Sequence, residues 1–268
     1  MNLLKIIEAL EANGYKAEDA RARLCQDIVL KAISESSLSK NVTIKGGVVM
    51  RSLTGNIRRA TQDIDIDFIR YGLSQDLIDV FIEKLNCLKG IVITRIGKIE
   101  ELNQQDYKGK RVYIKISDDN GSVITSKIDL GVHNHMELDQ EEYCFDIAFD
   151  DEGASLLINT KEQMFTEKLR SLMKFGSFNT RYKDIYDMYY QCEKLDESKL
   201  YQCFQSLIFN DKAMRENDTE GLVKRIESIF SDKIYKQRVD KSDKRWLDDD
   251  IEVIFSKIVE YLKGIKSV

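Results

Sequence analysis

Residues 63–68 alternate strictly between acidic and apolar side chains. The acidic residues share one face and the apolar residues the other: Asp63, Asp65 and Asp67 against Ile64, Ile66 and Phe68. A repeat of about two residues is typical of a β-strand with one buried face. The segment therefore predicts a strand that packs its apolar face into a core and carries three carboxylates on the other face.

The pattern of apolar residues changes along the chain at about residue 155. Before this point helical stretches alternate with short β-like segments: 2–36 and 74–85 are helical, and 42–44, 91–96, 112–116 and 128–132 are β-like. After Gly153 the strand pattern fades, and helical stripes continue to Leu262. We expect an α/β domain over residues 1–155, with a mixed sheet flanked by helices, and an α-helical domain over residues 156–268.

Composition narrows the class of protein. The chain has 268 residues and a formal net charge of −5, from 41 Lys and Arg against 46 Asp and Glu. This balance argues against an overall basic nucleic-acid coat, although a local basic patch remains open. Apolar runs are far shorter than the roughly 20 residues that cross a bilayer, and the five cysteines are scattered without a Cys-x-x-Cys pair. We expect a cytoplasmic protein without a membrane helix, disulfide framework or zinc site.

The acidic face of the predicted strand suggests a metal site. Asp63 and Asp65 lie roughly 7 Å apart at Cα on one face, so both can converge on a hard cation such as Mg²⁺. Asp67 lies one step further along and is less suited to share that ion. Asp129 stands alone between Ile128 and Leu130 on another predicted strand, where it could supply a third ligand. A bound divalent ion would offset the repulsion between these carboxylates, whereas a solvated strand face is the alternative.

A glycine pair precedes the carboxylates. Gly46 and Gly47 follow a β-like segment and come before a short predicted helix at 48–53. Two glycines there let backbone N–H groups approach a phosphate at a helix N-terminus, although a tight turn without a ligand also explains them. A phosphate cradle beside a two-carboxylate metal site is what nucleotidyl transfer requires.

Four motifs together resemble those of the AbiEii/AbiGii toxin family. They are Lys45-Gly46-Gly47, Arg59 to Ile66, Glu167 to Leu172 and Arg181 to Asp187, within a match that spans about residues 41–190. Members of this family are nucleotidyltransferases with the polymerase-β-like fold, associated with abortive phage infection and type IV toxin–antitoxin systems. One departure is Gly47, which stands where the wider superfamily often has Ser.

The resemblance implies roles for individual residues. Asp63 and Asp65 would hold Mg²⁺, for which Mn²⁺ is an alternative ion, and Asp129 is the third ligand expected from its place on the other predicted strand. The remaining predicted site residues would bind the NTP: Gly46, Gly47, Arg59, Thr61, Lys168, Asp184 and Asp187. Asp63, Asp65, Asp129 and Lys168 form the predicted catalytic set.

The residues around Lys168 indicate, separately from the resemblance, that its charge has a partner. It lies in an apolar stripe between Met164 and Leu172, where a charge is costly unless it is paired. We therefore expect an acidic or phosphate partner, although a lysine that extends from the edge of the stripe into water is an alternative. Asp184 and Asp187 follow Arg181 on one predicted helix, so an intrahelical ion pair explains part of that cluster without a substrate.

A basic stretch at residues 233–245 is a candidate RNA contact. Its six positive and two negative side chains leave a local charge of +4. Tyr235 and Trp246 lie in and beside it, and aromatic rings next to basic residues suit an RNA backbone with exposed bases. A solvated helix face is the equally weighted alternative.

These observations predict a Mg²⁺-dependent enzyme that transfers a nucleoside monophosphate from an NTP to an acceptor hydroxyl and releases pyrophosphate. By resemblance the acceptor is RNA, most plausibly the tRNA 3′ end, and an antitoxin would act without a stable complex. The helical half would complete the active-site cleft. Two alternatives stay open: modification of a small molecule, as in antibiotic-modifying transferases, and a nucleotide-binding module without turnover.

Overall fold

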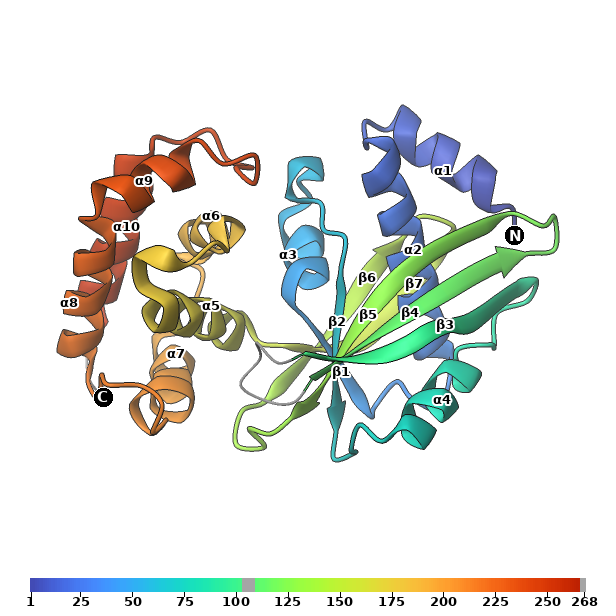
Figure 1. Ribbon diagram of the computed structural model, residues 1–268, viewed down its shortest axis with the longest axis horizontal. Coiled ribbons are helices and arrows are strands. Elements are labelled where there is room, and N and C mark those ends of the chain that lie inside the picture. The colour runs from blue at the N-terminus through green and yellow to red at the C-terminus, as the bar shows by residue number, and fades with distance from the viewer. Residues whose placement is uncertain (103–108, 266–268) are drawn as a thin grey trace. The chain divides into compact units, whose positions relative to one another are not determined.

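The computed structural model describes residues 1–102 and 109–265 (Figure 1). Contacts within the chain divide it into two compact units, Met1–Asn159 and Thr160–Val268. No helix in the described part of the chain combines the length and the hydrophobicity that a bilayer crossing requires.

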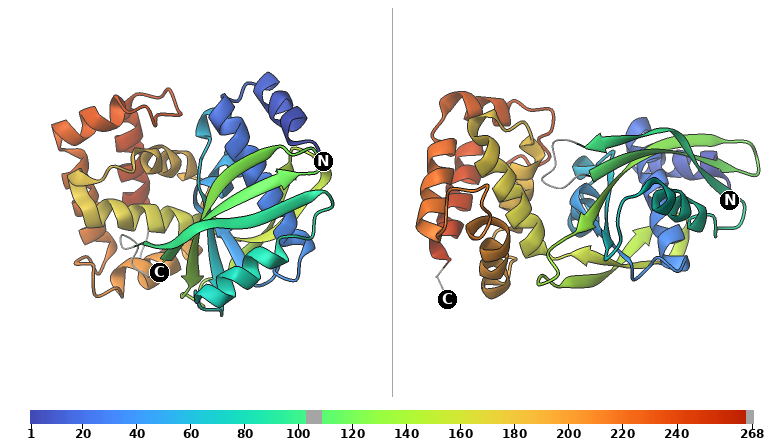
Figure 2. Two further views of the ribbon diagram at one scale, coloured as in Figure 1. Left: turned by 45° about the vertical axis from the view of Figure 1, so that its right-hand side comes forward. Right: turned by 60° about the horizontal axis from the view of Figure 1, so that its bottom comes forward.

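The first unit is built around one mixed β-sheet. Its elements in chain order are α1 (Leu3–Ala12), α2 (Ala17–Glu35), β1 (Val42–Lys45), α3 (Gly46–Thr54), the 3-10 helix η1 (Ile57–Arg59), β2 (Ile64–Ile69), α4 (Gln75–Lys84), β3 (Ile91–Leu102), β4 (Gly109–Asp118), β5 (Val123–His133), β6 (Gln140–Ile147) and β7 (Asp150–Asn159). Within the described residues seven strands pair in the order β3-β4-β5-β2-β1-β7-β6. The β2–β5 and β1–β7 pairs are parallel and the others antiparallel, and Figure 2 shows the resulting twisted sheet. The predicted mixed sheet flanked by helices is confirmed.

The alternation that opened the sequence analysis produces strand β2. Ile64 and Ile66 are fully buried, and Phe68 packs its ring against Phe81 of α4 with centroids 5.2 Å apart. Helix α2 packs against β5, β6 and β7, and α4 packs against β3. Burial of one apolar strand face under helices is the main source of stability for such a layer. This burial leaves the opposite, acidic face of β2 available for a functional site.

One part of the sequence prediction was wrong. The strand pattern does not fade after Gly153, because β7 continues to Asn159 and pairs in parallel with β1, with Thr43 opposite Leu157. Ala154, Leu156 and Ile158 alternate as buried residues along β7. Leu157, on the other face, hides this period of two, since it makes residues 156–158 an unbroken apolar run.

The second unit is helical, as predicted. Its elements are α5 (Lys161–Phe175), the 3-10 helix η2 (Gly176–Phe178), α6 (Tyr182–Gln191), α7 (Glu197–Phe204), the π-helix η3 (Gln205–Phe209), α8 (Thr219–Phe230), α9 (Lys233–Asp240) and α10 (Ile251–Gly264). Thr160 caps α5 by accepting a hydrogen bond of 3.1 Å from the backbone N–H of Gln163. Phe230 and Phe255 stack at 3.9 Å between centroids within its core.

Candidate active site

Charged residues from four strands form one row across the sheet. Lys45 on β1 is in register with Asp65 on β2, Asp65 with Asp129 on β5, and Asp129 with Arg111 on β4. Neighbouring strands lie about 4.8 Å apart. The fold therefore places the predicted carboxylates of Asp65 and Asp129 on adjacent strands, with a cation on each side of the pair.

Arg111 holds Asp129 in a fixed orientation. Its Nε donates to Asp129 Oδ1 and its Nη2 to Asp129 Oδ2, both at 2.7 Å. Asp129 is only 8% exposed, and a two-pronged guanidinium contact of this kind fixes both direction and distance. The same hydrogen bonds raise the pKa of Arg111, against the opposing effect of its own partial burial.

The other two carboxylates of the alternating segment have different surroundings. Asp63 lies just before β2, with a side chain 41% exposed and Oδ1 2.8 Å from Lys127 Nζ. Asp67 is buried, and its Oδ2 lies 2.7 Å from Lys45 Nζ. Asp67 therefore belongs to a buried ion pair within the sheet, which agrees with its exclusion from the predicted metal set.

The predicted metal ligands do not form a cluster as their side chains stand. Among the residues that the structure describes, no group of three or more His, Cys, Asp or Glu side chains is arranged to hold a metal ion. The physical reason is that Arg111 draws Asp129, and Lys127 draws Asp63, into ion pairs. The assignment of Asp63, Asp65 and Asp129 to a metal stays a prediction.

The glycine pair packs directly against this row. Gly46 has φ +67°, and a Cβ added there would lie 3.0 Å from Asp65 Cγ and nearer still to its carboxylate oxygen. A Cβ on Gly47 would lie 2.8 Å from Thr61 Cβ. Both positions therefore need glycine, the first for its left-handed backbone as well as for space.

Helix α3 begins at this glycine turn, with Lys45 at its N-cap position. A lysine side chain has no acceptor, so it cannot satisfy the first backbone N–H groups of the helix. Helix N-termini of this kind attract phosphate groups. The geometry thus places a candidate phosphate cradle beside the Asp65 carboxylate.

Arg59 and Thr61 lie on the segment between α3 and β2. Arg59 ends η1 and is 3% exposed. The backbone carbonyl of Thr61 accepts a 2.7 Å hydrogen bond from Gln26 Nε2 of α2, which fixes the segment where Thr61 meets Gly47. Contact of either residue with a nucleotide stays a prediction.

In the helical unit, taken by itself, Lys168 has the acidic partners that the sequence predicted. The residue is 5% exposed, and its Nζ lies 3.2 Å from Asp184 Oδ1 and 3.1 Å from Asp187 Oδ2. Arg181 also pairs with Asp184, at 2.6 Å, as the alternative explanation required. Burial disfavours the ionised form of Asp184, but Lys168 and Arg181 outweigh it and lower its pKa to about 2.

The predicted aromatic RNA surface is wrong. Tyr235 and Trp246 are each 1% exposed and belong to the core of the helical unit. Trp246 Nε1 donates to Asp187 Oδ1 at 3.1 Å, so the ring fixes the carboxylate that pairs with Lys168. Three of the basic side chains are also paired with acids: Lys236 with Glu252, Lys244 with Asp243 and Arg245 with Asp240.

Sequence reasoning missed Arg111, Lys127 and Trp246 as partners of the predicted carboxylates. Arg111 and Tyr113 alternate with buried Val112 and Ile114 on β4, so their side of the sheet could have been deduced. Their distance from Asp129 could not, because it depends on which strands pair and in what register.

One of three comparisons with known proteins, the family model, agrees with the motifs. A comparison with curated proteins finds no match. Among solved structures, a solution structure of the antibiotic-resistance factor ANT(2'')-Ia is 18% identical, covers 68% of this chain and 88% of its own, and gives a TM-score of 0.40. That score is too low to support an argument about fold or substrate. The family model for the nucleotidyl transferase AbiEii toxin of type IV toxin–antitoxin systems matches residues 28–260. The chain therefore belongs to the AbiEii family of nucleotidyltransferase toxins.

Proposed function

We propose that this nucleotidyltransferase uses Mg²⁺ to transfer a nucleoside monophosphate from an NTP to a hydroxyl at the 3′ end of tRNA. The observation that supports the chemistry best is the register of Asp65 and Asp129 on adjacent strands, directly beside the Gly46-Gly47 turn. Carboxylates and a glycine turn on neighbouring strands of a sheet can serve a metal and a polyphosphate together.

The residues present fit a hard divalent ion. Asp63 and Asp65 supply oxygen ligands two residues apart, and the absence of a side chain at Gly46 leaves the Asp65 carboxylate room beside the backbone. Oxygen-only donors suit Mg²⁺ and also Mn²⁺. When bound, the ion would neutralise phosphate charge and lower the pKa of the acceptor hydroxyl.

The glycine turn would orient the triphosphate. Backbone N–H groups of Gly46 and Gly47 open helix α3, so they can donate to phosphate oxygens along the helix dipole. Thr61 packs where a side chain at position 47 would otherwise lie. We assign its hydroxyl the donor role that a serine at that position plays in the wider superfamily.

Asp129 would position the acceptor. Its carboxylate is held on both oxygens by Arg111 at 2.7 Å, so its direction is set before the acceptor binds. From this place it would accept the hydrogen bond of the attacking hydroxyl and take its proton. Lys168 would neutralise charge on the leaving phosphates, a role that rests on the family resemblance.

The choice of RNA as acceptor also rests on the family. The basic stretch at 233–245 gives it less support than its composition indicated, because its aromatic residues are buried. We further propose action in the cytoplasm and a cognate antitoxin that does not form a stable complex with the toxin.

The test is transfer of label from each of four α-labelled NTPs to total tRNA, in Mg²⁺ and in EDTA. We expect one nucleotide to label intact tRNA and to leave periodate-oxidised tRNA unlabelled, since oxidation destroys the 3′ hydroxyls. Asp65→Asn should reduce transfer by about 10³-fold or more, whereas Asp79→Asn, a partly exposed partner of Arg95, should not. Folded protein that labels no tRNA with any NTP would refute the proposal.

A further inference from the structure

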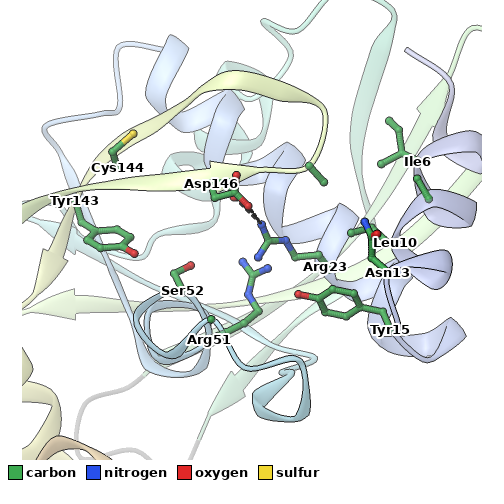
Figure 3. A pocket seen from close by; sticks show the side chains of 13 residues that line it. Ile6, Leu10, Asn13, Tyr15, Arg23, Arg51, Ser52, Tyr143, Cys144 and Asp146 are labelled. Carbon is green, nitrogen blue, oxygen red and sulfur yellow. Dashed lines mark hydrogen bonds and ion pairs between the residues drawn. The ribbon is translucent and has the colours of Figure 1, made fainter.

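A pocket lies in the first unit and shares no residue with the predicted site. It has a volume of about 400 Å³, and residues of α1, α2, α3 and β6 line it (Figure 3). Pockets that bind small molecules run from about 300 to 1,000 Å³. The pocket is thus large enough for a ligand up to about the size of a mononucleotide.

Arg51 of α3 is the unusual feature of this pocket. It is 2% exposed, and none of its three side-chain nitrogens has a hydrogen-bond partner within the described residues. Among the described residues its ion pair is a long one, at 3.5 Å from Nη2 to Asp27 Oδ1. A guanidinium has five N–H donors, and donors that stay unsatisfied in a protein interior are costly. Arg51 is therefore short of acceptors.

Arg23, next to Arg51 in Figure 3, is by contrast held in place. Its Nε donates to Asp27 Oδ2 at 2.8 Å, and its Nη2 donates to the Asp146 carbonyl at 2.6 Å. Two buried arginines against one buried carboxylate, Asp27, leave a charge of +1 in this interior. An unbalanced buried charge favours binding of an anion.

Asp146 shows where such an anion would sit. Its carboxylate lies 3.3 Å from Arg23 Nη2, yet its side chain is 95% exposed. A carboxylate so open to water is weakly held, so an incoming oxyanion can take its place beside the Arg23 guanidinium, next to which Arg51 lies. The nitrogens of Arg51 are closed to water, so their contact with the oxyanion requires the side chains around them to rearrange.

The remaining lining selects among anions. Ser52 Oγ is buried without a hydrogen-bond partner within the described residues, and the phenols of Tyr15 and Tyr143 also face the pocket. Burial raises the pKa of both tyrosines, so their hydroxyls stay protonated as donors. Together, these hydroxyls and the arginine offer more hydrogen-bond donors than the two oxygens of a carboxylate can accept. The three terminal oxygens of a phosphate monoester match this number of donors better.

We propose that this pocket binds a small phosphorylated ligand, with its phosphate between Arg51 and Arg23 in the place of the Asp146 carboxylate. Apolar side chains of α1, Ile6 and Leu10, form the wall against which the rest of the ligand packs. The proposal is independent of the transfer reaction, because it needs neither the carboxylates of β2 nor a metal.

The experiment is calorimetric titration of the full-length protein in EDTA with inorganic phosphate, each of four nucleoside monophosphates, and acetate. We expect phosphate or a monophosphate to bind and acetate not to. Arg51→Lys keeps the positive charge but removes the planar guanidinium, which can donate two parallel hydrogen bonds to one phosphate, and should weaken binding about tenfold. Asp146→Asn removes the competing charge and should tighten binding roughly threefold to tenfold. Arg95→Lys, remote from the pocket, is the matched control.

Two features keep the test decisive. Asp146→Asn alters an exposed side chain and predicts a gain, which loss of folding cannot imitate, and Ser52→Ala replaces Arg51→Lys if that variant does not fold. Binding of inorganic phosphate alone identifies the free ion as the source, and preference for one monophosphate identifies a nucleotide. Absence of binding by every probe, equal binding of acetate, or binding that Arg51→Lys and Asp146→Asn leave unchanged would overturn the proposal.

Discussion

Replacing Gly46 with alanine tests the contact between the glycine turn and Asp65. The new Cβ would lie 3.0 Å from Asp65 Cγ and 3.3 Å from its Cβ, closer than such atoms pack, so the carboxylate must turn away. The backbone at Gly46, with φ +67°, also disfavours any residue with a Cβ. The substitution therefore combines backbone strain with a displacement of the proposed metal ligand.

The two effects have different magnitudes and different readouts. A non-glycine residue in the left-handed region costs about 1–2 kcal/mol. For a domain of this size, each kcal/mol lowers Tm by about 2–4 °C, which gives a decrease of about 2–8 °C. Displacement of a catalytic group by about 1 Å costs on the order of 10²-fold in rate. We expect a modest loss of stability with a large loss of activity.

Gly97→Ala separates the two effects. Gly97 has φ +68°, yet a Cβ added there meets nothing within 4 Å, so it reproduces the strain without the collision. Calorimetric melting should show similar decreases in Tm for the two variants, and label transfer at saturating NTP should fall only for Gly46→Ala. Equal transfer rates would refute the argument that the glycine turn sets the position of Asp65.

Three further predictions concern other contacts. Gly47→Ser should lower transfer because it collides with Thr61, whose Cβ would lie 2.8 Å from the new Cβ, and adding Thr61→Gly, which removes that Cβ as well, should recover at least about tenfold, since one hydroxyl then replaces the other. Arg111→Lys should reduce kcat by about 10–100-fold with little change in Tm, because lysine cannot make the two parallel hydrogen bonds that orient the Asp129 carboxylate. The low pKa of Asp184, about 2, predicts that its ion pairs stabilise the helical unit above about pH 4, and that about 2 kcal/mol is lost as pH falls through 2. Urea unfolding followed by Trp246, the single tryptophan, measures this loss.

For each of these predictions, one outcome would contradict it. A double variant no more active than Gly47→Ser would show that the Thr61 hydroxyl does not replace the missing serine. Unchanged kcat in Arg111→Lys would mean that the orientation of the Asp129 carboxylate is irrelevant to the reaction. For the pH effect, Asp184→Asn is the control: it should be less stable than the wild type at pH 5 and show a smaller acid-dependent loss, and parallel curves for the two proteins would contradict the assignment.

The spacing of apolar residues along the chain predicted the helices and strands that bury one face. The alternation at 63–68 gave β2, and the apolar stripe around Lys168 indicated a buried charge that needs a partner. Both are properties of neighbours along the chain, which periodicity records. Strand β7 was not predicted because Leu157 joins Leu156 and Ile158 into one short apolar run, so the pattern no longer distinguishes strand from helix.

Long-range partners could not be predicted from the same patterns. Lys45 pairs with Asp67, Arg111 with Asp129, and these contacts depend on strand order and register. Trp246 looked like an exposed base-stacking residue because it follows a basic stretch, yet burial in the helical core and a hydrogen bond to Asp187 determine its role. Composition indicates what a segment could bind and does not say which side chains tertiary packing removes from the surface.

The most direct test of the central claim is the position of Mn²⁺ in crystals grown with a non-hydrolysable NTP, located by anomalous scattering. The account predicts a peak within about 2.0–2.4 Å of carboxylate oxygens from both Asp63 and Asp65, with the phosphates at the Gly46-Gly47 turn. This requires Lys127 to release Asp63, whose Oδ1 it holds at 2.8 Å. Bound nucleotide with Mn²⁺ coordinated away from Asp65 would contradict the account.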